Sequence, residues 1–157
     1  MFEFAVDVSD LDRAFNVAGE FFENDVIPIA HPIVTRIVKK NMNAGTDPVT
    51  GGKWEVYKPS YAETREKLGK QTEHVDFQVT GSLIEHIGWF EDLRMVTVDP
   101  LSYNESGAKP VPHATIAEGL SYGIPKNNVV PRPFLTAGQE TADEIVKEVT
   151  EAFDRLQ

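Results

Sequence analysis

Apolar side chains recur every three or four positions near the amino terminus, which is the pattern of an amphipathic helix. The repeat continues as far as residue 37, although Pro28 and Pro32 interrupt it and each lacks a backbone N–H donor. We therefore predict a helix over 10–27, a kink or short break, and a second helix over 32–43 that ends at a Gly45 cap. The apolar positions of the first helix are Leu11, Ala14, Phe15, Ala18, Phe22 and Val26.

The carboxy-terminal sequence has the most regular amphipathic pattern in the chain, and it predicts a helix over 137–156. Thr136 and Thr141 are the candidate N-caps, the second with Glu144 in a capping box. The apolar stripe of this helix consists of Ala142, Ile145, Val146, Val149, Phe153 and Leu156.

Between these helices the signals are shorter, and residues 54–135 are predicted to form a mixed α/β core. The predicted elements are a Gly-rich loop (45–53), a charged helix (60–69), a half-buried strand (75–79), a short helix (80–87), a hairpin (87–90 with 94–98), a loop (99–112), a short helix or turn (113–121) and a loop (123–128). The fold class is therefore α+β in a single domain over 1–157, with a small antiparallel sheet flanked by an N-terminal helical region (10–43) and the C-terminal helix.

Composition narrows the class of protein further. The 157 residues include no cysteine, which excludes disulfides, thiolate nucleophiles and cysteine zinc sites. No apolar run reaches the roughly 20 residues that span a bilayer, and the first residues do not resemble a signal peptide. We therefore expect a protein of a reducing cytoplasm that does not act at a membrane.

Charge is negative overall but unevenly distributed. The 25 acidic and 15 basic residues give a net charge of −10, which disfavours non-specific nucleic-acid binding. Residues 1–30 carry a net −6, whereas residues 31–70 carry a net +4. Two interpretations stay open: an acidic and a basic surface that meet between subunits, or an unevenly charged solvated surface.

No catalytic, metal or cofactor motif stands out, so we predict no catalytic residue, no metal ligand and no cofactor. Gly52 and Lys53 resemble the end of a phosphate-binding loop, but Asp47 and Trp54 stand where that motif needs a glycine and a Ser or Thr. The serines lack the context of a nucleophile elbow. The histidines, which lack metal-ligand spacing, are His31, His74, His86 and His113.

Three short segments occur in a distinctive order. The first runs from Gly52 through Trp54 to Ser60, the second is Thr80-Gly81-Ser82-Leu83, and the third is Arg132-Pro133-Phe134-Leu135 before the amphipathic helix. Together they resemble the tail-completion or head–tail joining proteins of tailed bacteriophages and the related virion-morphogenesis proteins. Ala114 and Glu118 match part of a further segment of these families, in which the tyrosine and the glycine position differ here.

Each matching residue also has a physical role. Gly81 permits a tight turn into the short helix, and Leu83 can bury one face of that helix. The prolines on both sides of Arg132, including Pro133, hold the chain extended, and Phe134 follows as a core residue. The guanidinium of Arg132 could pair with a carboxylate of the same or a neighbouring subunit. The candidate interaction and structural residues are Trp54, Thr80, Gly81, Leu83, Glu118, Arg132, Pro133 and Phe134.

The resemblance implies a structural, non-enzymatic virion protein of the phage neck, assembled in the host cytoplasm. Such proteins commonly form a hexameric ring between the head connector and the tail, with other neck, connector and tail proteins as partners. DNA passes through the ring without specific binding, and the loops 45–53 and 99–112 would reach neighbouring subunits.

Other functions stay open beside this one. A tail terminator or a minor capsid protein would assemble in the same way with different partners. A small cytoplasmic enzyme or metal-binding protein could use His74, His86 and His113. A monomeric module could bind a peptide through Trp54 and Trp89.

Overall fold

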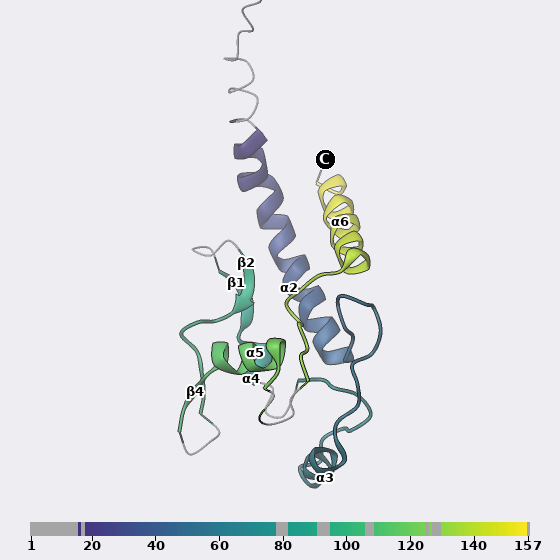
Figure 1. Cartoon of the computed structure of the whole chain (residues 1–157). Coiled ribbons are helices and arrows are strands. Elements are labelled where there is room, and N and C mark those ends of the chain that lie inside the picture. The colour runs from purple at the N-terminus through teal and green to yellow at the C-terminus, as the bar shows by residue number, and fades with distance from the viewer. Residues whose placement is uncertain are drawn as a thin grey trace, which may run out of the picture.

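The computed structural model describes residues 16, 18–77, 82–90, 95–105, 109–124, 126 and 130–156. Predictions for the first fifteen residues, for Val79, and for the motif residues Thr80 and Gly81 lie outside these ranges. The architecture is α+β, as predicted, with two long helices and two separate antiparallel strand pairs (Figure 1).

The N-terminal helix is continuous, which corrects the predicted break at Pro28 and Pro32. Residues 18–21 are helical and lead directly into a π-helical turn, η1 (Phe22–Val26), and then into α2 (Ile27–Ala44). Pro28 lies in the first turn of α2, directly after the wider π turn, and Pro32 lies inside the helix. A proline removes one backbone hydrogen bond and crowds the carbonyl four residues earlier. The wider π turn directly before Pro28 accommodates the missing hydrogen bond, so the helix does not end there. Gly45 caps α2 in the left-handed conformation, as predicted, with φ of 64°.

The predicted loop over 45–53 forms, and an antiparallel bridge closes it. Thr46 and Lys53 form an isolated antiparallel bridge, and Asp47 accepts hydrogen bonds from Val49 N–H and the Thr50 hydroxyl. Residues 45–53 are therefore held by their own polar groups. The predicted charged helix follows as α3 (Pro59–Lys67).

The central hairpin is also confirmed. The short helix α4 (Ser82–Glu85) leads into β1 (Ile87–Phe90), which pairs with β2 (Met95–Val98). The strand expected at 75–79 is not formed over 75–77, where Phe77 has a positive φ of 56° that a strand cannot accommodate. The expected loop at 99–112 contains a further pair, β3 (Tyr103–Asn104) with β4 (Val111–Pro112).

Two helices complete the chain, α5 (His113–Tyr122) and α6 (Gln139–Asp154). The prediction that a threonine caps the last helix is wrong, because the N-cap residue is Gly138. Thr141 is instead buried and donates its hydroxyl hydrogen to the carbonyl of Pro48 at 2.8 Å. The N–H of Gly138 donates to the same carbonyl, so two hydrogen bonds attach the start of α6 to the 46–53 turn.

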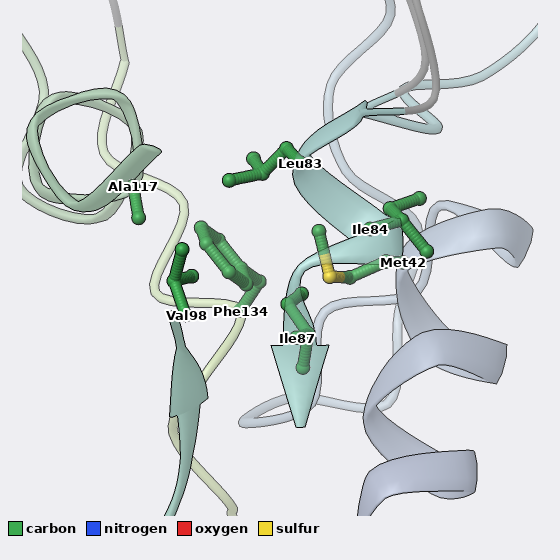
Figure 2. Packing of buried hydrophobic residues seen from close by; sticks show 7 residues of the cluster. All are labelled: Met42, Leu83, Ile84, Ile87, Val98, Ala117 and Phe134. Atoms are coloured by element: carbon green, nitrogen blue, oxygen red, sulfur yellow. The ribbon is translucent and has the colours of Figure 1, made fainter. Parts of the chain in front are cut away.

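The core lies where α4, the central hairpin, α5 and the end of α2 meet. Its seven buried residues include Phe134, which is only 2% exposed (Figure 2). Phe134 belongs to the core, as predicted, although α6 begins only at Gln139. The remaining members are Met42, Leu83, Ile84, Ile87, Val98 and Ala117.

Candidate functional site

The most deeply buried charge belongs to Arg65 on α3, whose side chain is 1% exposed. Its Nη2 atom lies 2.9 and 3.0 Å from the two carboxylate oxygens of Asp76, and its Nε donates to the carbonyl of Gln71. The Gln71 amide donates to Asp76 as well, at 2.7 Å. The charge pair is thus bonded on all sides, which a buried ion pair needs to be tolerated.

Tyr57 closes this cluster from the other side. Its hydroxyl donates to Asp76 Oδ1 at 2.9 Å and accepts from the Asp76 N–H, while its ring lies 4.4 Å below the guanidinium carbon of Arg65. Burial, together with the adjacent Asp76 carboxylate, raises the pKa of Tyr57 to about 12. The cluster therefore fixes α3 against the segment before residue 77.

A second polar network lies under α5, around the fully buried ring of His113. Ser102 donates to the carbonyl of Asp99, so it accepts from Nδ1 of His113 at 2.9 Å. Nε2 lies 2.8 Å from the Ser82 hydroxyl and accepts its hydrogen when the ring is neutral. Burial lowers the pKa of His113, as does the charge of His86, which stacks on it, while Asp99 opposes the shift.

This geometry bears on the histidine hypothesis. Both ring nitrogens of His113 are bonded to serines, and His86 stacks on its ring. His74 bonds instead to the carbonyl of Asn43, so the structure does not bring all three histidines to one point. Within the described ranges no group of three His, Cys, Asp or Glu side chains is placed to hold a metal ion. The network connects α4, α5 and the loop after β2.

The predicted motif residues fall partly into one cluster. The Trp54 ring contacts Phe77 edge-on at 6.4 Å, and Phe77 contacts Phe134 at 5.1 Å. Leu83 lies in the same core, so three of the predicted residues are brought together. The indole N–H of Trp54 is buried and has no hydrogen-bond partner among the residues that the structure describes.

The other predicted residues lie apart. Glu118 is exposed on α5, and Pro133 is half-buried. Arg132 is half-buried, its backbone N–H donates to the carbonyl of Leu120, and its guanidinium makes no ion pair in the described part of the chain. Burial lowers the pKa of Arg132, against the opposing influence of Tyr57 and Glu55. The guanidinium is therefore partly desolvated without a paired carboxylate.

A shallow groove of about 710 Å³ lies between α2 and β1. His31 and Trp89 form its aromatic side, with ring centroids 5.7 Å apart and the planes nearly perpendicular. The side chains of Arg36, Lys39 and Lys40 line the other side. Among the residues that the structure describes, no acid lines the groove, although the chain has 25 acids against 15 bases.

Two of these bases also hold α6 in place. Arg36 pairs with Glu148, and Lys40 pairs with Glu144 at 2.6 Å. Phe21 contacts Phe153 edge-on near the far end of the two helices. The first described turns before α2 and the end of α6 lie at the same end of the molecule, away from the strands (Figure 1).

Sequence reasoning missed the two buried networks and the groove. One signal was available for the groove, since Arg36, Lys39 and Lys40 follow each other at helical spacing in the basic stretch. No comparable signal connects Arg65 to Asp76 or Ser82 to His113, because each pair meets only after the chain turns.

No protein-family model, curated protein or solved structure matches the chain. Among the described residues no helix combines the length and the apolar character needed to cross a membrane.

Proposed function

We propose that the chain is a structural subunit of an oligomeric ring in the neck of a tailed bacteriophage, between the head connector and the tail. The sequence support is the order of the three segments around Trp54, Leu83 and Phe134, followed by an amphipathic helix. In the structure these three residues belong to a connected aromatic and aliphatic cluster. The three motif residues thus have a common packing role, which supports the proposal.

The observation that carries the proposal is a set of exposed apolar side chains on the α2–α6 pair, defined as residues 18–44 and 139–154. Val146 on α6 is 64% exposed, and Phe22 before α2 is 55% exposed. Leu156, just after α6, is 74% exposed. Exposed apolar side chains of this size are candidates for burial against a neighbouring subunit.

A ring requires two different patches per subunit, because each subunit meets its neighbours through unlike surfaces. A second set of exposed apolar side chains lies around β3, β4 and the end of α5. It comprises Leu101, Tyr103, Val111 and Tyr122. The α2–α6 pair and this second set are the proposed contacts to the two neighbours.

The negative charge fits a ring through which DNA travels. A net charge of −10 repels a duplex instead of gripping it, over a screening distance of about 8–10 Å at physiological salt. The proposed location is therefore the virion neck, with assembly in the host cytoplasm.

Native mass spectrometry and negative-stain electron microscopy test this proposal directly. We expect self-association at high concentration, and closed rings when connector or tail proteins are added. Val146→Asp introduces a charge on the open face of α6 and is expected to lower the oligomeric mass. Thr64→Asp adds the same charge at an exposed helical position on α3 and is the matched control.

The result that would overturn the proposal is a monomer at every concentration that also ignores connector and tail proteins. Binding to tail proteins alone would favour a tail terminator, and binding to capsid proteins alone would favour a minor capsid component.

A further inference from the structure

The described lining of the groove between α2 and β1 combines three bases with two aromatic rings and no acid. Arg36 and Lys40 are tied to α6 acids, but their side chains are still 53% and 55% exposed. A guanidinium has five N–H donors and an ammonium three, so each keeps donors for a second carboxylate. Lys39 makes no ion pair within the described residues.

These features specify the chemistry of an occupant. The bases select carboxylates, and the edge-to-face His31 and Trp89 rings offer a surface for an apolar or aromatic side chain. Thr35 and Asn43 add polar side chains to the lining. A short segment that alternates acidic with aromatic or aliphatic residues would match the groove.

The chain itself contains one such segment, and it lies outside the described residues. Residues 1–12 carry four acids (Glu3, Asp7, Asp10 and Asp12) and no Lys or Arg, interleaved with apolar residues that include Phe2 and Phe4. Of the undescribed internal segments, 91–94 is the one that contains acids, and it also contains Arg94 and lacks an aromatic residue.

We infer that the groove of one subunit binds the acidic N-terminal segment, residues 1–12, of a second copy of this chain. The geometry of α2 favours a second copy over the same one. Seventeen residues of helix separate residue 18 from Thr35, about 26 Å at the rise of an α-helix, so the segment of the same chain would have to double back. This inference rests on one part of the proposed function, namely that copies of this chain associate with one another.

The absence of cysteine permits a test without background cross-links. Two full-length variants, Phe4→Cys and Thr35→Cys, are made with tags of different size, mixed and oxidised. A disulfide between them can form only between two chains. We expect the heterodimer band to be at least about fivefold stronger than the band from Phe4→Cys mixed with Lys67→Cys, an exposed position on α3.

Charge reversal identifies the source of the affinity. Lys39→Glu in the Thr35→Cys chain is expected to reduce the cross-link about tenfold, because it places an acid opposite the acidic segment. Lys67→Glu in the same chain makes the same charge change on α3 and should leave the yield unchanged. Urea denaturation of each variant confirms that it is folded before the yields are compared.

Several outcomes would overturn the inference. Equal cross-link yields at positions 35 and 67 would mean that the disulfide forms by random collision. If a short DNA duplex binds the groove and abolishes the cross-link, the groove would be assigned to nucleic-acid binding. An oligomer by native mass spectrometry without the cross-link would remove this contact and leave the proposed ring standing. A monomer without the cross-link would remove both.

Discussion

The buried ion pair between Arg65 and Asp76 makes a strong prediction about stability. Asp76→Ala removes the carboxylate that accepts bonds from Arg65, Gln71 and Tyr57. The guanidinium of Arg65 is 1% exposed, so it cannot regain water without disrupting α3. An unpaired buried charge costs about 3–5 kcal/mol, a large share of the about 5–15 kcal/mol that stabilises a typical domain.

Urea denaturation followed by tryptophan fluorescence measures this cost. Glu73→Ala is the matched control, because it removes an exposed acid three residues earlier in the same segment. We expect that control to change the free energy of unfolding by no more than about 0.5 kcal/mol. Comparison of the two variants separates loss of a buried partner from loss of one negative charge.

A double-mutant cycle tests whether the two charges depend on each other. Replacing both members, as Arg65→Met with Asp76→Leu, should cost less than the sum of the single changes, because neither charge is then left unpaired. The reasoning is refuted if Asp76→Ala costs no more than Glu73→Ala, or if the single effects add. Either result would mean that Arg65 is solvated.

Three further predictions follow from the fold. The pKa of the buried His113 lies below that of an unfolded histidine, so the unfolded chain binds more protons than the folded chain near pH 6. The contribution of His113 to stability should therefore be complete above about pH 6.5 and should fall as the pH drops below that value. His113→Gln should remove this pH dependence from urea midpoints measured between about pH 7.5 and 5.5. Gly138→Ala should lower the melting temperature, because a Cβ there would overlap the Val49 carbonyl, whereas Gly19→Ala, in open space on a helix, should raise it. Phe134→Ala should cost about 3–5 kcal/mol in the same denaturation assay, and a cost below about 1 kcal/mol would contradict its place in the core.

The elements that sequence predicted well are those whose signal is local. The stripe of α6 and the alternation around β1 and β2 each lie within one window, and so does the Gly45 cap. Pro28 and Pro32 led to a wrong prediction of a helix break. A proline in the sequence indicates that one backbone donor is missing, but it does not indicate whether tertiary packing keeps the helix continuous.

The Arg65–Asp76 and Ser82–His113 networks could not be predicted from the sequence, and the reason differs from that for the prolines. Arg65 and Asp76 are eleven positions apart, and the chain brings them together through a turn in which Gly69 has a positive φ of 66°. Ser82 and His113 are thirty-one positions apart. Such pairs depend on the tertiary fold of the whole chain. The local sequence pattern does not indicate which acid will pair with Arg65 or which serine will bond to His113.

The charge of the whole chain is a poor guide to the charge of any one of its surfaces. Two acids of α6, Glu144 and Glu148, pair with bases of α2. The same two bases, together with Lys39, line a groove in which the structure describes no acid. A chain with a net charge of −10 thus carries a groove whose described lining is locally basic. The negative total opposes binding to a duplex, and the groove is the surface that we propose binds a short acidic segment of a second copy of the chain.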